Sequence, residues 1–597
     1  MGRTKILPVY PKFRLTFWSY KSSVEMAGCK ATMPPTGLAT VLAMLPQDKF
    51  EIADVVDMNV ESLRDEDIKN TDVVFTSTMI VQREAHERVV NRAHHFGKKV
   101  VAGGPFVTTY PEKTEADYIV AGEAEVTLGP FLDDFFAGAE RGVWTESGVK
   151  GRGTVQLTRG GKVELTKTPL PKWDSLNLRN YVSAAIQYSR GCPFDCDFCD
   201  ITKLFGRESR TKTPEQMTAE LKALYDAGHR GSVFIVDDNF IGNAKNVRQL
   251  LPHLREWQEN NGYPFSFYTE ASMNLAWKQN ADILAGMREA GFDFVFLGIE
   301  SIDDEVLKLM QKGQNTKMPQ LEAVRRIQNA GLKVSGGFII GSDGEKPSLF
   351  NNLYQFVQEA GIVQAMPGLL TAVRGTDLYN RLSREGRIRE ESSGNNTHDL
   401  RFNFRTQLDE AFLIEGYKKL LGDLFDAKNY YGRCRVLRDN LGDHLASKRV
   451  GREGATAFMR SMAKQLFTRG GLEYAKYLGE TLVRKPSYFS EAVADGIKFH
   501  HLSAITRGTL DADRYVTQTS KLYEAFSHKA KEIYGTHRDN LAAAKHEISA
   551  VASSTLARAE RGLSKLHRDF RERAAFAYNG MRERIQTDLS NYMDGAS

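Results

Sequence analysis

Three cysteines within eight residues have the types and spacing to bind a metal cluster. Cys192, Cys196 and Cys199 are three of only five cysteines in 597 residues. They follow Gly191 on a predicted loop, and thiolates spaced by four and three residues can converge on one iron-sulfur cluster. A zinc site would normally need a fourth protein ligand in the same compact unit, which this segment lacks. We therefore expect a cubane cluster with one iron open to a substrate or cofactor; three unrelated buried cysteines are the disfavoured alternative.

The chain around this segment has the composition of a soluble globular protein. Its 597 residues suggest three or four domains, and its 41% hydrophobic and 26% charged residues exclude a disordered or collagenous chain. No apolar run approaches the roughly 18 residues of a membrane span, and no secretory leader precedes the first predicted strand. An odd and sparse cysteine content does not form a disulfide framework. We expect a cytoplasmic protein in which Cys29 and Cys434 are structural and buried.

Positive charge is concentrated toward the C-terminus. The net charge of the whole chain is only +5, which does not indicate a nucleic-acid partner. Residues 441–597 hold 25 Lys and Arg against 18 Asp and Glu. Between residues 471 and 501, aromatic and aliphatic residues occur at partly helical spacing with lysines and arginines between them. Core packing of a helical cap is the favoured explanation, and a basic amphipathic surface that contacts a membrane is the alternative.

The first 140 residues predict a doubly wound α/β domain, because short apolar runs alternate with helical patterns. The predicted strands are Ile6–Tyr10, Phe50–Val56, Val73–Thr76, Lys99–Ala102 and Tyr118–Val120, and the predicted helices are Gly37–Leu45 and Arg83–His95. Ligands of such sheets bind beyond the carboxyl ends of the strands. These ends carry small or polar residues that together favour a bound cofactor over ordinary turns: Asp57, Asn59, Ser77, Gly103, Gly104, Pro105, Gly122 and Glu123.

The remaining residues predict a linker, a second alternation of strands and helices, and a helical end. Residues 141–184 read as a linker with a small hairpin that includes Thr154–Leu157. Residues 185–400 contain six strand-helix repeats, too few for a complete eight-fold barrel, and predict a partial open barrel. Its predicted strands are Ala185–Tyr188, Val233–Val236, Phe265–Thr269, Phe294–Leu297, Val334–Ile340 and Gly368–Val373. Residues 401–597 predict a mainly helical region with a long helix over Asn540–Arg573.

The cysteine segment resembles a known family signature. Cys192-x-x-x-Cys196-x-Phe198-Cys199 is similar to the signature of the radical S-adenosylmethionine (SAM) superfamily. With the preceding domain, the chain resembles the cobalamin-binding subclass and most closely the branch of the hopanoid C-methylases. The segments that carry the likeness are residues 16–21, 103–105, 122–125, 236–243, 269–272, 298–301 and 337–341. The resemblance implies a [4Fe-4S] cluster on the three cysteines, SAM on the fourth iron, Phe198 against the adenine, and cobalamin in the first domain.

Acidic residues follow three successive strands of the predicted barrel. Asp237 and Asp238 follow the second strand, Glu270 ends the third and Glu300 ends the fourth. A carboxylate at a strand end in solvent explains each one alone, but three successive ends favour a site. By resemblance, Asp237 or Asp238 would accept hydrogen bonds from the SAM ammonium. Glu270 would lie where relatives bind the SAM ribose, Glu300 would line the same mouth, and Gly341 would end the strand that passes the adenine.

Two positions depart from the family pattern. Cobalamin domains that supply a histidine to cobalt carry it where Asn59 stands. The resemblance then implies cobalt without a histidine ligand, with Ser77 and Gly103–Pro105 holding the cofactor's tail; loss of cobalamin binding is the alternative. Arg374 stands where relatives usually have proline before Gly-Thr, which puts the carry-over of their substrate in doubt.

The resemblance implies a C-methyltransferase that acts on an unactivated carbon of a lipid or terpenoid-like substrate. A carbon without an acidic proton is ill suited to acid-base chemistry, so that demanding cofactors are needed. A cobalamin-dependent oxidoreductase or cyclase is the alternative among enzymes, and a non-catalytic cobalamin or iron-sulfur sensor is the alternative of another class. The expected partners are a small-molecule or lipid substrate and an electron donor such as flavodoxin or ferredoxin, with no nucleic acid.

Overall fold

The computed structural model describes residues 2–146, 148–150, 163–441, 452–468, 470–537 and 540–594. The chain divides into two compact units, residues 1–501 and residues 502–597. The predicted strand piece Thr154–Leu157 lies outside the described residues. No helix among the described residues is both long and apolar enough to cross a membrane.

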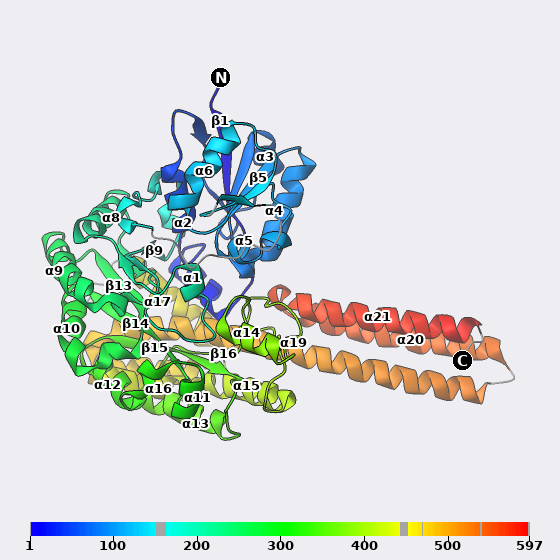
Figure 1. The fold of residues 1–597 in the computed structure, drawn as a ribbon. Coiled ribbons are helices and arrows are strands. Elements are labelled where there is room, and N and C mark those ends of the chain that lie inside the picture. Colours follow the sequence, from blue (N-terminus) through cyan, green and yellow to red (C-terminus); the bar gives the residue numbers. More distant parts are fainter. Residues whose placement is uncertain are drawn as a thin grey trace. The chain divides into compact units, whose positions relative to one another are not determined.

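Among the described residues, the first sheet contains eight strands, seven of which run parallel (Figure 1). Its order is β2-β1-β4-β5-β6-β7-β8, and β3 pairs with β1 beside β2. The strands are β1 (Thr4–Tyr10), β2 (Phe50–Ile52), β3 (Val56–Asp57), β4 (Val73–Ser77), β5 (Lys99–Gly103), β6 (Tyr118–Val120), β7 (Gly142–Thr145) and the antiparallel β8 (Gly148–Lys150). The strand predicted over Phe50–Val56 is therefore split. Between its halves, the Val55 amide leaves the sheet and donates to the Ser175 carbonyl over 3.0 Å.

Helices cover both faces of this sheet because neighbouring strand residues point to opposite sides. On one face, Val74 and Val100 pack with α4 (Arg83–His95) and α5 (Pro105–Thr109). On the other, Val73 and Val101 pack with α2 (Thr36–Met44) and α6 (Ala124–Phe136). The doubly wound fold predicted from the sequence is confirmed.

The second sheet is a six-stranded parallel sheet in the order β16-β15-β14-β13-β12-β9. Its strands are β9 (Ser183–Ile186), β12 (Gly231–Ile235), β13 (Phe265–Ala271), β14 (Phe292–Glu300), β15 (Lys333–Ile340) and β16 (Ala365–Leu369). The connecting helices are α8 (Pro214–Asp226), α9 (Ala244–Asn260), α10 (Ala281–Glu289), α12 (Gln320–Asn329) and α13 (Leu349–Ala360). Since β9 and β16 are not paired with each other, the barrel is open, as predicted.

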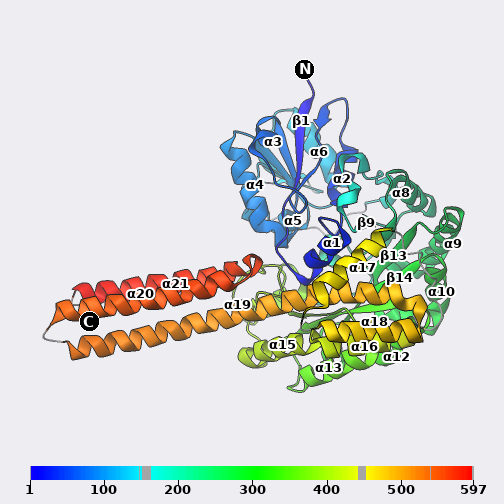
Figure 2. The same ribbon diagram turned by 180° about the vertical axis from the view of Figure 1, so that it is seen from behind.

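Helices follow the barrel up to residue 501 (Figure 2). They are α15 (Glu410–Leu424), α16 (Ala427–Asn440), α17 (Arg452–Gln465), α18 (Gly471–Arg484) and the start of α19 (Phe489–Thr536). Tyr474, Tyr477 and Phe499 are buried, so core packing accounts for much of the apolar pattern between residues 471 and 501. Cys434 is buried as expected, whereas Cys29 is only half-buried, contrary to the prediction.

The second unit has a helical core of its own. It contains the end of α19, α20 (Leu541–Lys565) and α21 (Arg571–Asp594). The helix predicted over Asn540–Arg573 is therefore wrong as one element, since Leu566 is extended and ends α20. The break lets Ile585 of α21 pack with Ile548 of α20 in one core, which a continuous helix would prevent.

Candidate active site

The cysteine loop begins at a turn that requires glycine. β10 (Ser189–Arg190) pairs antiparallel with β11 (Arg210–Thr211), and the segment with the three cysteines connects them. Gly191 has φ +90°, and a Cβ there would collide with the carbonyls of Glu208 and Gly206. Only glycine fits this turn without displacing backbone. The turn therefore directs the chain from the barrel into Cys192.

Two of the predicted carboxylates hold this turn. Asp237 accepts hydrogen bonds from the Tyr188 amide over 2.8 Å and from the Ser189 hydroxyl over 2.7 Å. Asp238 accepts one from the Gly191 amide over 2.9 Å. Burial is the main cause that raises the pKa of Asp237 to about 7 and that of Asp238 to about 6. Both oxygens of Asp237 are thus occupied by the turn, and of the two residues Asp238 is better placed to meet a ligand.

The three thiols are close enough to interact electrostatically, and two of them receive amide donors. Burial raises the pKa of Cys199, and the charges of Asp200 and of the other two thiols raise it further. The side-chain amide of Asn239 lies 3.8 Å from the sulfur of Cys192, and that of Gln314 lies 3.7 Å from the sulfur of Cys196. Such donors to cysteine sulfur are found around iron-sulfur clusters.

The arrangement of the thiols suits a cluster better than a single ion. Within the described ranges, no three or more His, Cys, Asp or Glu side chains are grouped closely enough to hold one metal ion. A cubane instead binds each cysteine through a different iron, so its ligands surround a volume and do not meet at a point. Three cysteines on one loop, two of them with amide donors, fit that group.

A buried lysine lies beside the loop and was not predicted from the sequence. Lys312 is 7% exposed, and its ammonium donates to Glu300 over 2.6 Å. The same ammonium lies 5.7 Å from the ring centroid of Phe198, and its charge interacts with Cys196 and Cys199. Glu300 itself has φ +63°, an uncommon conformation for a residue with a side chain. The lysine places a positive charge next to the thiols.

The predicted carboxylates at the strand ends share one region. Burial, followed by the charges of Asp238, Glu300 and Asp237, raises the pKa of Glu270 to about 7. A positive charge nearby would lower the pKa of Glu270, so this edge of the barrel favours a cationic ligand. SAM is a cation, since it carries a sulfonium and an ammonium group.

Gly341 also needs its lack of a side chain. Its φ is +102°, and a Cβ there would collide with the ring of Phe402. Its amide donates to Glu345 over 2.9 Å, and burial raises the pKa of that carboxyl to about 7. Glycine at the end of β15 therefore makes room for the ring of Phe402.

The strand ends of the first sheet form one edge, which carries a glycine at a position where no side chain would fit. Gly104 has φ +96°, and a Cβ there would lie 2.7 Å from the Thr78 carbonyl oxygen and 3.2 Å from the Ser77 hydroxyl. Pro105 begins α5 directly after it. Gly122 has φ +91°, and its amide donates to the Thr108 hydroxyl over 3.0 Å.

The side chain of Asn59 is hydrogen-bonded to other residues of the first domain. Its amide nitrogen donates to Asp57 over 2.7 Å, and its side-chain oxygen accepts from the Phe13 amide over 2.8 Å. The position where some cobalamin domains carry a histidine is therefore engaged with the protein itself.

Glu123, which the sequence suggested as a cofactor-binding residue, forms buried ion pairs. Its carboxylate is 1% exposed and accepts from Arg190 and from Arg210, each over 2.9 Å. Glu125 pairs with the same Arg190 over 2.8 Å. These ion pairs connect the start of α6 to the two strands that flank the cysteine loop. The structure thus places Glu123 in a buried ionic network.

Arg374 also contacts the first domain. It donates to Glu112 over 2.5 Å and to Glu391, and its guanidinium carbon lies 4.7 Å from the ring centroid of Tyr110. Glu112 and Tyr110 follow α5, whereas Glu391 follows the barrel. The residue that departs from the family pattern therefore links the two domains.

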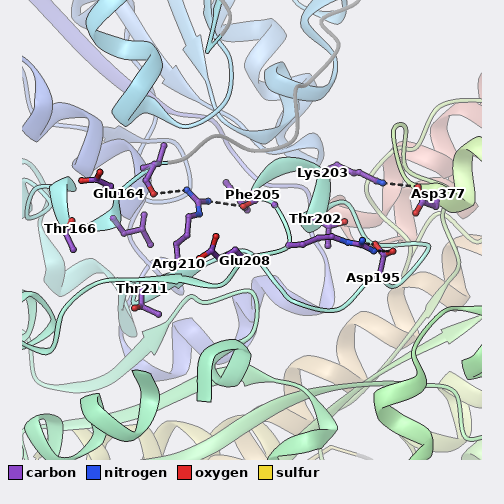
Figure 3. Close-up of a pocket in the computed structure, with 14 residues that line it drawn as sticks. Glu164, Thr166, Asp195, Thr202, Lys203, Phe205, Glu208, Arg210, Thr211 and Asp377 are labelled. Carbon is purple, nitrogen blue, oxygen red and sulfur yellow. Dashed lines mark hydrogen bonds and ion pairs between the residues drawn. The ribbon is translucent and has the colours of Figure 1, made fainter. Parts of the chain in front are cut away.

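A cavity of about 790 Å³ adjoins the cysteine loop (Figure 3). Its walls include Asp195 from the loop and Arg210 from β11, and Lys203 pairs there with Asp377 over 2.9 Å. Its charges are largely paired with each other, unlike the cluster of carboxylates at the strand ends.

Comparison with known families and proteins agrees with this site. The B12 binding domain model matches residues 24–131, the Radical SAM superfamily model residues 186–357, and a domain of unknown function (DUF4070) residues 376–514. An uncharacterized methyltransferase of Synechocystis sp. is 40% identical over 433 residues, which cover 72% of this chain and 77% of that relative. The hopanoid C-2 methylase of Rhodopseudomonas palustris is 38% identical over 386 residues, covering 64% and 71%.

Solved structures share the architecture. The radical SAM methyltransferase TsrM from Kitasatospora setae, with cobalamin and a [4Fe-4S] cluster bound, matches 84% of this chain and 100% of its own, with a TM-score of 0.54 and 14% identity. That likeness concerns the fold.

The matched domains define a radical SAM enzyme whose cofactors are a [4Fe-4S] cluster, SAM and cobalamin. With relatives at 38% and 40% identity over most of their length, the chain belongs to the cobalamin-binding radical SAM methyltransferase family.

Proposed function

We propose that this enzyme methylates an unactivated carbon of an apolar, lipid or terpenoid-like substrate. The observation that carries the proposal is the cysteine loop bordered by carboxylates at three successive strand ends, in a chain 38% identical to a hopanoid C-2 methylase. When bound, the cluster and SAM supply a radical that removes a hydrogen atom from carbon, and cobalamin supplies the methyl group.

In this proposal the barrel's own residues bind the cluster and SAM. Cys192, Cys196 and Cys199 hold the cluster, and Phe198 contacts the adenine of SAM. Asp238 and Glu270 face the cationic part of SAM, because burial and mutual repulsion leave them without full charge compensation. Glu300 lines the same mouth with Lys312, while Asp237 positions the turn before the cysteines and the backbone at Gly341 approaches the adenine.

The first domain holds cobalamin along the strand ends of its sheet. The residues that line this edge are Ser77, Gly103, Gly104, Pro105 and Gly122. At Gly103 and Gly122 the nearest atom to the place of a Cβ lies 3.6 and 3.9 Å away, so a cofactor can approach the backbone there. The side chain of Asn59 is hydrogen-bonded to Asp57 and to the Phe13 amide, so it supplies no ligand to cobalt. Both domains together exclude water from the reacting groups.

The products of the reaction distinguish the candidate functions. A methyltransferase forms 5′-deoxyadenosine and S-adenosylhomocysteine together, a cyclase or oxidoreductase forms only the first, and a sensor forms neither. Cys196→Ala should abolish SAM cleavage and the Mössbauer signal of the cluster, whereas Cys29→Ala, a change at a half-buried cysteine outside the loop, should preserve both. Continued SAM cleavage by the Cys196 variant would contradict the assignment.

Whole lipid extracts can reveal the substrate. Extracts of cells with and without the enzyme, compared by mass spectrometry, should differ by one added CH₂ group on an apolar compound. A substrate that is dehydrogenated or cyclised would support the oxidoreductase alternative.

We also propose that the enzyme is cytoplasmic and receives electrons from a donor such as flavodoxin or ferredoxin. We further propose that it contacts a membrane peripherally. Val483 is 84% exposed and lies beside Arg484 and Lys485, so a small apolar and basic surface faces outward from α18. Val483→Asp should reduce co-sedimentation with anionic liposomes. Equal binding of the variant and the unchanged enzyme would remove the membrane proposal.

A further inference from the structure

Three consecutive residues after β12 contact successive parts of the chain that leads to the first cysteine. Asp237 accepts a hydrogen bond from β10, and Asp238 accepts one from Gly191 in the turn. The next residue, Asn239, reaches Cys192 itself, since its side-chain nitrogen lies 3.8 Å from that sulfur. Asn239 is only 2% exposed, so the contact with the sulfur is shielded from water.

The orientation of the Asn239 side-chain amide is fixed by Ser272. The oxygen of this amide accepts hydrogen bonds from the Ser272 backbone amide and from the Ser272 hydroxyl, each over 3.2 Å. A backbone N–H can only donate, so the oxygen of Asn239 must face Ser272 and the NH₂ group must face the sulfur. The reverse orientation would place two donors against each other and an oxygen against a thiolate. The hydrogen bonds therefore allow a single orientation of this amide.

Ser272 has a backbone amide available because β13 ends one residue earlier, at Ala271. The sheet supplies no acceptor beyond that point, and Ser272 is only 8% exposed. A buried backbone amide requires an acceptor, and Asn239 provides it from 33 residues away. The two residues belong to residues 236–243 and 269–272, two of the segments that carry the family resemblance. The contact between them gives these segments a shared role.

Asparagine suits position 239 better than a third aspartate would. A carboxylate could accept from Ser272 equally well, but its second oxygen would face the sulfur of Cys192. Negative charge at that place opposes the further negative charge that a reduced cluster carries. Asparagine keeps the acceptor for Ser272 and places a donor toward the sulfur on the same planar group.

We propose that Asn239 donates a hydrogen bond to the cluster ligand Cys192, that Ser272 positions it, and that this contact raises the reduction potential of the cluster. The inference rests on the proposed binding of the cluster by the three cysteines. Reduction adds one negative charge, which is shared by the cysteine sulfurs, so a donor to sulfur stabilises the reduced form more than the oxidised form. The hydrogen bond then makes the cluster easier to reduce, which the radical chemistry requires.

The reduction potential tests the role of Asn239 independently of activity. It is measured by EPR redox titration of the anaerobically reconstituted full-length enzyme without SAM. Asn239→Ala should lower the ratio of reduced to oxidised cluster at a fixed potential at least about threefold, because one donor to sulfur is lost. Asn239→Asp should lower this ratio further, although it keeps an acceptor for Ser272.

The matched control is Asn246→Ala. Asn246 is a half-buried amide on α9 that donates to Thr211, on the strand that follows the cysteine loop, over 2.8 Å. It therefore contacts the same part of the barrel through a hydroxyl and not through a sulfur. Its replacement should leave the reduction potential unchanged.

A double-mutant cycle tests whether Ser272 acts through Asn239. Ser272→Ala removes the hydroxyl donor and keeps the backbone donor, so it should shift the potential in the same direction as Asn239→Ala but less. In the Asn239→Ala background, Ser272→Ala should cause no further shift. A merely structural role of Ser272 would give the same shift in both backgrounds.

Pulsed EPR of the unchanged enzyme observes the hydrogen bond directly. Asparagine labelled with nitrogen-15 in its side chain should give a nitrogen coupling to the reduced cluster, and Asn239→Ala should remove it. This measurement decides the matter even where a variant binds its cluster poorly, because the enzyme itself is unaltered.

The results separate this inference from the assignment of the cluster. A reduced cluster without nitrogen coupling in the unchanged enzyme, or equal potentials of the Asn239→Ala and Asn246→Ala variants, would overturn the role of Asn239. Recovery of the original potential by Asn239→Asp would overturn it as well, and additive shifts in the cycle would overturn the positioning by Ser272. Absence of any [4Fe-4S] signal from the unchanged enzyme would contradict the binding of the cluster by the cysteines, and the inference with it.

Discussion

The buried ionic network around Glu123 predicts that one uncharged substitution will strongly destabilise the protein. Glu123 accepts from Arg190 and Arg210, each over 2.9 Å, and the three side chains are 1%, 13% and 14% exposed. Replacing Glu123 by Gln keeps its shape and removes its charge. Arg190 then keeps Glu125 as an ionic partner, whereas Arg210 loses the carboxylate of Glu123.

The expected loss follows from the burial of these charges. Removing one partner of a buried ion pair typically costs about 3–5 kcal/mol, because the other charge stays buried without compensation. The amide of Gln still accepts one hydrogen bond, so the lower end of about 3 kcal/mol is expected. The matched control is Glu87→Gln, since Glu87 pairs with Arg83 over 2.8 Å while both side chains are more than 40% exposed. That change should cost about 0.3–0.5 kcal/mol.

Urea unfolding followed by circular dichroism measures the difference. Glu123→Gln should lower the midpoint of the first transition clearly, and Glu87→Gln should leave it nearly unchanged. In a double-mutant cycle with Arg190→Gln, the combined loss should be smaller than the sum of the single losses. Equal midpoints for the two glutamine variants, or additive losses in the cycle, would refute the idea that this network holds the cysteine turn to the first domain.

Three further predictions concern the candidate active site. Burial, together with neighbouring carboxylates, raises the pKa of Glu270 to about 7, so its charge is lost as pH falls from 8 to 6. SAM affinity, measured by equilibrium dialysis, should weaken by up to about tenfold over that range, and a Glu270→Gln variant that keeps this pH dependence would contradict the assignment. Gly341→Ala should lower the melting temperature, because φ is +102° and the new Cβ would collide with the ring of Phe402. The control Gly313→Ala, whose Cβ would meet no atom within 4 Å, should not lower it. Equal melting temperatures of the two variants would exclude the steric argument. Lys312→Met should make the reduction potential of the cluster more negative, because a positive charge beside the thiols is lost. The control is Lys308→Met, since Lys308 is exposed. An EPR redox titration in which the two variants shift the potential equally would refute the electrostatic role of Lys312.

Much of the fold was predictable because buried strands and amphipathic helices leave periodic patterns. The helix predicted over Arg83–His95 and the strand over Tyr118–Val120 match the structure residue for residue. The periodic pattern predicted the wrong element boundaries where contacts between distant segments determine the structure. The Val55 amide leaves its predicted strand to pair with Ser175, and a helix break at Leu566 lets α21 fold back on α20.

The candidate site was predictable only in part. The cysteine spacing and the carboxylates at strand ends are local signals, and the structure brings Cys196, Glu270 and Glu300 to one edge of the barrel. Lys312 and Gln314 escaped prediction because nothing in their local sequence shows that they face the cysteines. The nearby Asn239 could have been suspected, since it lies in one of the segments that resemble the family.

The sequence by itself determined the elements and the chemistry they carry, because thiolate spacing, apolar periodicity and turn glycines act over a few residues. The tertiary structure decided what each polar group does. Glu123, at a strand end that suggested a cofactor, became the counterion of Arg190 and Arg210, and the motif around Trp18 acquired a place against Phe296. The free energy of a buried charge or an exposed ring depends on partners tens or hundreds of residues away, and only the folded chain brings them together.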